Sequence, residues 1–136
     1  MKTLAVIVSG GSTNNLIQVF TLAMASVHAD ITIRLFFRDE SVFRLMPAKI
    51  NQVEFSSPYA DDPALTQRLK RLDLTDLHKL ARDIKASGDV KYYACSSSLA
   101  IAGLTREDLI PEIDEVRGLP AFLLEDVAAA DKVLTF

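Results

Sequence analysis

The sequence contains a single cysteine, Cys95, among its 136 residues. One cysteine cannot form an intramolecular disulfide, and this usage is typical of a reducing compartment, so we expect a cytoplasmic protein. The chain also lacks C-x-x-C and H-E-x-x-H spacings. His28 and His78 are each expected on a helix, as surface or boundary residues, so we predict no metal site and no cofactor.

Long apolar runs are also missing. The run at residues 4–8 is far too short for a transmembrane helix and lacks the length of a signal-peptide core. Lys and Arg total 15 against 18 Asp and Glu, so there is no basic excess to neutralise phosphates. Neither membrane nor nucleic-acid binding is expected, and we interpret the basic stretch at 67–71 as the solvated face of a helix.

The composition is that of an ordinary globular protein, with 49% apolar and 24% charged residues. A chain of 136 residues favours one domain, residues 1–136, large enough to bury a core without disulfides or metals. No repeats or linkers are apparent. A single folded unit is therefore predicted.

The pattern of apolar residues predicts about five strands. Residues 4–8 form a continuous apolar run, which is typical of a strand buried on both faces. Runs rich in β-branched and aromatic residues indicate further strands. The predicted strands are residues 4–8, 31–37, 90–94, 113–116 and 132–136. Residues 48–63 show no clear period, although 52–55 fits a short edge strand.

Helical periodicity separates these strands. Residues 13–28 carry an apolar stripe at three- and four-residue steps, with Ser12 or Thr13 as the cap. Asp73 is expected to begin another helix, and Gly88 to end it in the left-handed conformation. Helices are predicted at 13–28, 39–45, 64–71, 73–85, 99–102, 105–110 and 118–130. The alternation predicts an α/β fold: a three-layer α/β/α sandwich with a mostly parallel sheet.

Two segments are expected at the carboxyl edge of this sheet, where ligands bind in open α/β folds. One is Ser9, Gly10, Gly11 and Ser12, after the first strand, and the other is Cys95 with Ser96, Ser97 and Ser98, after the third. We take the glycines and serines as candidate ligand-binding residues. Phe36 and Phe37 end the second strand near the same edge, where they either line a pocket or pack in the core.

Cys95 is the candidate catalytic residue. A helix is expected to begin close after it, and the positive end of a helix stabilises a thiolate and lowers its pKa. The alternative is a buried, inert cysteine, since free cysteine is among the most buried residue types. Residues alone leave both interpretations open.

The segment Ser9 to Ser12 also has two interpretations. Its backbone N–H groups can face an anion at the start of the next helix. However, it is not a G-x-G-x-x-G motif, and no Walker lysine follows. A tight strand-to-helix turn, which needs glycine in any case, is therefore favoured over a nucleotide site.

The chain resembles the DsrE/DsrF-like family, particularly its DsrE2-type members. The resemblance rests on GDVKYYAC at 88–95, LAIAGLTREDL at 99–109 and GLPAFLLEDVAAADKVLTF at 118–136, with LAVIVSGG at 4–11 also similar. It implies a flavodoxin-like sandwich, assembly into trimers or hexamers, and a persulfide carried on Cys95 and passed to a partner. The family often has Gln-Met after this cysteine, where this chain has Ser96 and Ser97.

These observations lead to one main functional hypothesis and two alternatives. The main hypothesis is a sulfur carrier or sulfurtransferase that relays a persulfide through Cys95 between sulfur donor and acceptor proteins. The alternatives are a non-catalytic ligand-binding or adaptor module and a thiol redox sensor. A mean hydropathy of +0.19 fits a homo-oligomer in each case, because some apolar helix faces would be buried between subunits.

Overall fold

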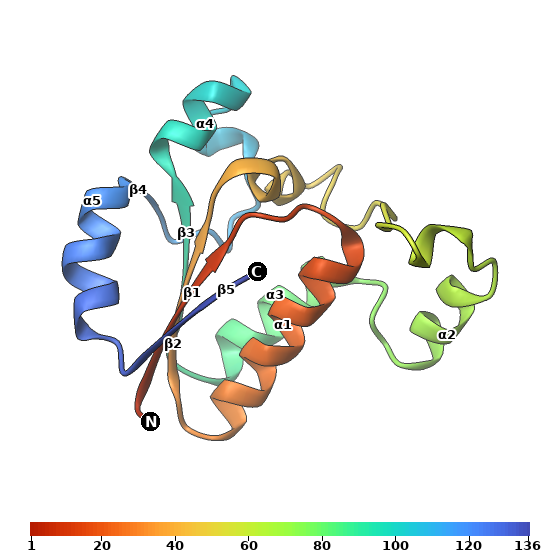
Figure 1. Ribbon diagram of the computed structural model, residues 1–136, viewed down its shortest axis with the longest axis horizontal. Coiled ribbons are helices and arrows are strands. Elements are labelled where there is room, and N and C mark those ends of the chain that lie inside the picture. The colour runs from red at the N-terminus through yellow and green to blue at the C-terminus, as the bar shows by residue number, and fades with distance from the viewer.

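The computed structural model describes all residues, 1–136, and its centre is a five-stranded parallel sheet (Figure 1). The strands are β1 (Thr3–Val8), β2 (Thr32–Phe37), β3 (Val90–Cys95), β4 (Glu115–Arg117) and β5 (Lys132–Thr135). They lie in the order β4-β3-β2-β1-β5, and every neighbouring pair is parallel. The predicted α/β class with a parallel sheet is confirmed.

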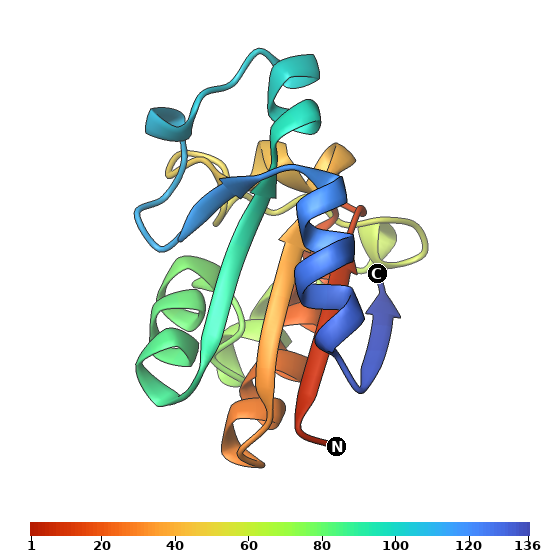
Figure 2. The same ribbon diagram turned by 90° about the vertical axis from the view of Figure 1, so that its left-hand side faces the viewer.

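Helices cover both faces of the sheet. The helices α1 (Thr13–His28) and α3 (Leu77–Ser87) pack side by side on one face. On the other face lies α5 (Leu119–Ala121), which continues into a π-helical segment, η4 (Phe122–Val127) (Figures 1 and 2). The connection from β4 through α5 and η4 crosses this face and brings β5 beside β1.

The remaining short helices lie around the sheet rather than on it. The helix α4 (Ser96–Ala102) follows β3 directly and stands beyond the carboxyl ends of the strands, whereas α2 (Leu65–Arg71) lies well away from the sheet (Figure 1). Three 3-10 helices complete the fold: η1 (Asp39–Leu45), η2 (Tyr59–Asp61) and η3 (Arg106–Asp108). None of the helices is both long and apolar enough to cross a membrane.

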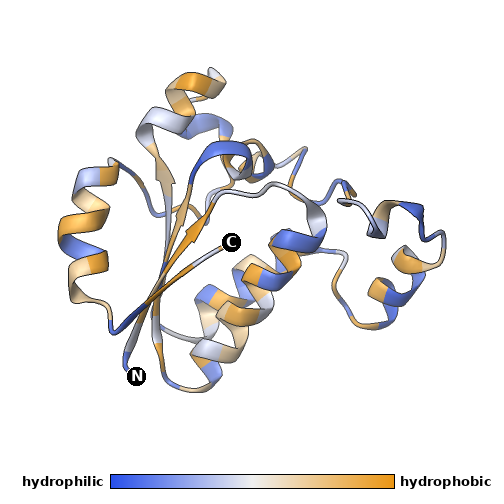
Figure 3. Ribbon diagram, in the orientation of Figure 1, coloured by the Kyte–Doolittle hydropathy of each residue, from blue (hydrophilic) through white to orange (hydrophobic).

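The two faces of the sheet carry cores of unequal size. Figure 3 shows apolar residues concentrated along the central strands. A cluster of 25 buried residues includes side chains of α1 and α3, and a cluster of five, including Phe122, lies on the α5 side. Phe36 belongs to the small cluster and Phe37 to the large one, because successive strand residues face opposite sides. Both are buried, so packing is the role that the structure shows.

The helix expected from Asp73 begins later, at Leu77. Asp76 is its N-cap, and its carboxylate accepts a hydrogen bond of 3.0 Å from the Lys79 N–H. Asp73 instead adopts a left-handed conformation in the preceding turn, with φ of 57°. The prediction for Gly88 is also wrong, since its backbone is extended. Glycine is needed there because a Cβ atom would lie 2.8 Å from Cβ of Val27 on α1.

Three further boundaries differ from the predictions. Residues 52–55 are not a strand, because their carbonyl groups face the α1 N-terminus and a buried arginine instead of a neighbouring strand. The fourth strand starts at Glu115, since Ile113 still donates its N–H to Ile110 within a turn. The helix after Cys95 begins at once, at Ser96, so all three serines belong to α4.

Candidate functional site

Cys95 is the last residue of β3 and the N-cap of α4. It belongs to the small core cluster, together with Ala5, Phe36, Tyr93 and Phe122, and the residue is only 1% exposed. The structure therefore places the thiol under a cover, as the interpretation of a buried cysteine predicts, and not in an open cleft. The cover over the thiol consists of α5 and η4, which belong to the C-terminal part of the chain and cross this face of the sheet.

The thiol nevertheless lies just below the surface. Its sulfur is 3.2 Å from the hydroxyl oxygen of Ser97, and Ser97 is exposed. Burial, the largest single influence, raises the pKa of Cys95, but hydrogen bonds from Ser97 and Ser98 together outweigh it and hold the pKa below its ordinary value. The result is a covered thiol that ionises more readily than a free one.

The other two serines fix the surroundings of this thiol. Ser98 is buried, and its hydroxyl accepts a hydrogen bond of 2.9 Å from the backbone N–H of Asp39, which ties α4 to the segment after β2. Ser96 is exposed and faces the start of α5: its hydroxyl oxygen would lie 3.8 Å from a Cβ atom on Gly118. The serines thus connect Cys95 to two neighbouring loops.

A cavity of about 270 Å³ joins the two segments predicted to meet at this edge. Ser9 lines it from the end of β1, and Ser97 and Ser98 line it from α4. The other lining residues are Arg38, Asp39, Phe43, Ile101 and Ala102. Arg38 and Asp39 are not among the site residues predicted from the sequence, although their position directly after β2, at the carboxyl edge, is a signal that would have found them.

The remaining predicted ligand residues, Gly10, Gly11, Ser12 and Ser96, do not line this cavity. The N–H groups of Ser9 and Gly10 both donate to the carbonyl oxygen of Phe136, at 2.7 and 3.3 Å. The Ser12 hydroxyl accepts from the Asn15 N–H and caps α1. These contacts are typical of a tight strand-to-helix turn. The N–H groups of Ser9, Gly10 and Asn15 donate to acceptors within the chain itself.

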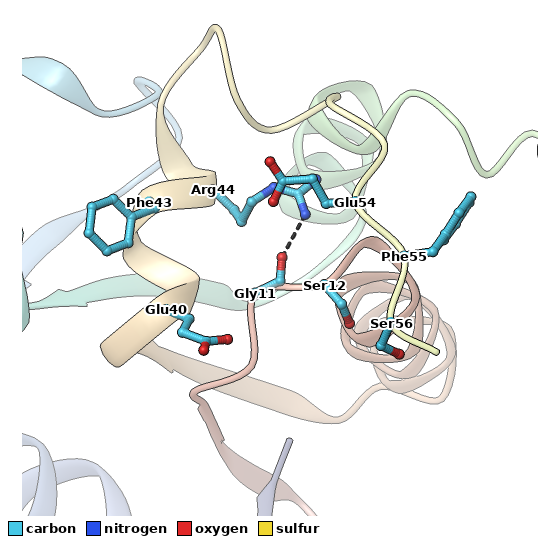
Figure 4. A pocket seen from close by; sticks show the side chains of 8 residues that line it. All are labelled: Gly11, Ser12, Glu40, Phe43, Arg44, Glu54, Phe55 and Ser56. Carbon is cyan, nitrogen blue, oxygen red and sulfur yellow. Dashed lines mark hydrogen bonds between the residues drawn. The ribbon is translucent and has the colours of Figure 1, made fainter. Parts of the chain in front are cut away.

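Gly11 and Ser12 line a second, larger cavity of about 430 Å³ (Figure 4). Its other lining residues are Glu40, Phe43, Arg44, Glu54, Phe55 and Ser56. The buried Arg44 guanidinium donates to the carbonyl oxygen of Gly11 at 2.6 Å, and to three carbonyls of the loop that follows. Burial lowers the pKa of Arg44, partly offset by Glu54. Its donors therefore organise the loop.

The histidines lie outside both cavities. His78 on α3 contacts the Glu112 carboxylate at 2.9 Å, and His28 ends α1. No group of three or more His, Cys, Asp or Glu side chains comes together as metal ligands. The site consequently offers one thiol, three serine hydroxyls, and Arg38 and Asp39 as its charged groups.

Comparison with known proteins gives one family and one fold. The model of the DsrE/DsrF-like family matches residues 1–136. No curated protein matches the sequence. Among solved structures, the chain is similar to MTH1491, a protein of unknown function from Methanobacterium thermoautotrophicum, with a TM-score of 0.62 and 14% identity over 98% of this chain and 99% of that one. At this identity, the likeness shows the fold alone.

Proposed function

The chain belongs to the DsrE/DsrF-like family, and from that premise we propose that it is a sulfur carrier, with a persulfide held on Cys95. The family is associated with sulfur relay. The single observation that supports Cys95 as the carrier is its contact of 3.2 Å with the Ser97 hydroxyl, within a set of hydrogen bonds that lowers the thiol pKa. A thiolate is the form that attacks sulfur.

The proposed reaction is a thiol exchange that needs no external oxidant. The Cys95 thiolate attacks the outer sulfur of a donor persulfide, R–S–SH, and a new S–S bond forms on Cys95. The S–S bond of the donor breaks, and its electron pair leaves with the donor as a thiolate, which then takes up a proton. An acceptor thiolate removes the same outer sulfur in the second half of the cycle, and the Cys95 thiolate is regenerated.

The cover over Cys95 sets a condition on this reaction. Since the residue is 1% exposed, a donor reaches the sulfur only after the neighbouring groups move. The smallest such movement is rotation of the exposed Ser97 side chain, because its hydroxyl lies directly against the thiol. A larger one is displacement of α5, whose start lies beside Ser96.

The direct test is mass spectrometry of the intact protein after incubation with a persulfide donor. We expect a gain of about 32 Da, one sulfur atom, which a thiol reductant removes. The variant Cys95→Ser must show no gain, and Ser96→Ala, which keeps the thiol, must show the full gain. A wild-type protein that takes up no sulfur, although its fold is intact by circular dichroism, would rule out the carrier role.

The burial of Cys95 favours a second candidate, a binding or adaptor module without catalysis. In that case the cysteine is a packing residue of the small core, and the function lies in the cavities at the carboxyl edge. The variant Cys95→Ala would then retain the cellular role of the protein. If the protein is a sulfur carrier, the same variant must lose that cellular role. The same burial sets the same condition on the redox-sensor alternative, because a disulfide between two chains also forms only after the groups over Cys95 move.

The partners in this proposal are a sulfur donor, an acceptor protein and further copies of the chain, in a cytoplasmic setting. Two large apolar side chains, Ile101 on α4 and Leu124 on η4, are 88% and 78% exposed. Such residues are suited to burial between subunits. Light scattering of the purified protein tests assembly into a trimer or hexamer, and a monomer at every concentration would contradict it.

A further inference from the structure

Arg38 differs from the other arginines that are at least partly buried. Arg34 pairs with Asp89, Arg117 pairs with three carboxylates, and Arg44 donates to backbone carbonyls. Arg38 is half-buried and forms neither an ion pair nor a side-chain hydrogen bond. A guanidinium carries five fixed donors that match a carboxylate, so a partly desolvated one without a partner is available to a ligand.

The cavity beside Arg38 also carries a negative charge. Asp39 lines the same space of about 270 Å³, and its carboxylate forms no ion pair. Ser9, Ser97 and Ser98 also line the cavity, and its apolar lining residues are Phe43, Ile101 and Ala102. The volume is just below the usual range for small-molecule sites, about 300–1,000 Å³, so only a small ligand fits. Arg38 and Asp39 carry opposite charges and both line this small space, which suits a zwitterion with an α-carboxylate on Arg38 and an α-ammonium on Asp39.

Ser97 connects this cavity to the candidate sulfur carrier. It lines the cavity, and its hydroxyl is 3.2 Å from the Cys95 sulfur. We propose that the cavity is the donor site and that it binds a small amino-acid persulfide, such as the persulfide of free cysteine. Arg38 and Asp39 hold its charged groups, and the Ser97 side chain swings aside to admit the outer sulfur. This inference rests on the proposed function, and it names the class of donor.

The chemistry of the step balances as a simple transfer. The Cys95 thiolate bonds to the outer sulfur, the S–S bond of the bound cysteine persulfide breaks, and cysteine departs as a thiolate that takes up the proton. Arg38 and Asp39 take no part in bond breaking. They are binding residues, whose loss must raise KM more than it lowers kcat.

Binding is tested separately from reaction, on the Cys95→Ser protein with S-methyl-L-cysteine as an unreactive zwitterionic probe. Titration calorimetry should detect binding, and Arg38→Ala should weaken it by about tenfold or more, since a charge-assisted hydrogen-bond pair is lost. Asp39→Asn should weaken it as well. The control Arg71→Ala removes an exposed arginine on the distant α2 and should leave the affinity unchanged. Equal affinity in Arg38→Ala and its parent would overturn the site.

A second measurement separates this inference from the proposed function. The protein with Cys95 is loaded from cysteine persulfide or from thiosulfate, which has no ammonium group. Arg38→Ala and Asp39→Asn should raise KM for cysteine persulfide, and Asp39→Asn should leave loading from thiosulfate unimpaired. Loading that is unaffected by either variant refutes the donor site while the carrier role stands. Probe binding without any loading of Cys95 refutes the carrier role instead.

Discussion

The hydroxyl oxygen of Ser97 lies 3.2 Å from the sulfur of Cys95, at the junction between β3 and α4. This contact joins the most buried reactive group of the site to an exposed side chain. Removing the hydroxyl should therefore change two properties together. The thiol loses a hydrogen bond that favours its thiolate, and it gains access to solvent.

The first prediction uses the pH dependence of alkylation to separate these two effects. The midpoint of iodoacetamide labelling in the wild type should lie at lower pH than that of an unstructured cysteine peptide in the same buffer, because the pKa of Cys95 is lowered. Ser97→Ala should move the midpoint upward, even if the limiting rate at high pH increases. Ser96→Ala is the matched control and should keep the wild-type midpoint. An unchanged midpoint in Ser97→Ala would show that the hydroxyl does not stabilise the thiolate.

The second prediction concerns the cover on the α5 side. Phe122 is fully buried, and its ring stacks on that of Phe36 with centroids 4.5 Å apart. Phe122→Ala should cost about 3–5 kcal/mol of unfolding free energy and should accelerate labelling of Cys95 under native conditions. Urea denaturation and native-state alkylation measure the two effects.

Two controls make this second prediction specific. Ala128→Ser, at an exposed helical position directly after η4, should change stability by no more than about 0.5 kcal/mol. Ile84→Ala should destabilise the opposite core without uncovering the thiol, because Ile84 belongs to the larger cluster. If Ile84→Ala accelerates alkylation as much as Phe122→Ala does, the thiol is reached by global unfolding and not through the cover.

Local sequence patterns predicted the strands and main helices because each depends on residues close together in the chain. The run at residues 4–8 is apolar throughout, which by itself indicates a buried strand. The apolar stripe of α1 is recognised from the three- and four-residue spacing within that helix. The burial of Cys95 could not be predicted in this way. It depends on which face of the sheet the Cys95 side chain occupies. It also depends on η4, a helix more than twenty residues later in the chain, which packs against that face.

Arg38 and Asp76 illustrate the same distinction on a smaller scale. After a strand, Arg38 looks like any surface arginine, and only the three-dimensional arrangement shows that it has no partner, whereas Arg34 and Arg117 are paired with carboxylates. Asp73 and Asp76 are equally good capping residues by type. The choice of Asp76 depends on Asn51, whose side-chain amide donates to the Asp76 carboxylate at 3.0 Å from a loop distant in the sequence.

The third prediction tests this cap and its pH dependence. Asp76→Ala should destabilise the protein by about 1 kcal/mol at neutral pH, since an N-cap hydrogen bond is lost. The backbone N–H of Lys79 is the main cause that lowers the pKa of Asp76 in the folded state. The carboxylate thus stabilises the fold above the unfolded pKa of about 3.9, and this contribution disappears as the pH falls through the folded value.

Urea denaturation at several pH values checks both parts of the third prediction. The difference between wild type and Asp76→Ala should narrow as the solution is acidified below about pH 4. Asp73→Asn, which keeps a residue that tolerates the left-handed conformation, should be close to the wild type throughout. A difference that widens in acid would mean that the protonated side chain is the better cap.

The fourth prediction concerns Arg44, which is 3% exposed and has no carboxylate partner within ion-pair distance. Its guanidinium donates to the carbonyl oxygens of Gly11, Lys49, Ile50 and Gln52 at 2.5–3.3 Å. Substitution by Met leaves these buried acceptors without donors, which should cost about 3 kcal/mol. Hydrogen exchange in residues 48–55 should accelerate more than in the sheet.

Arg44→Lys separates the role of charge from the role of geometry at this position. A lysine ammonium keeps the positive charge but cannot reach four carbonyls arranged around a planar fork, so this variant should lose most of the same stability. Arg71→Ala, which removes an exposed arginine, should stay within about 0.5 kcal/mol of the wild type. If Arg44→Lys retained full stability and protection, the positive charge alone would hold the loop, and the directed hydrogen bonds would be dispensable.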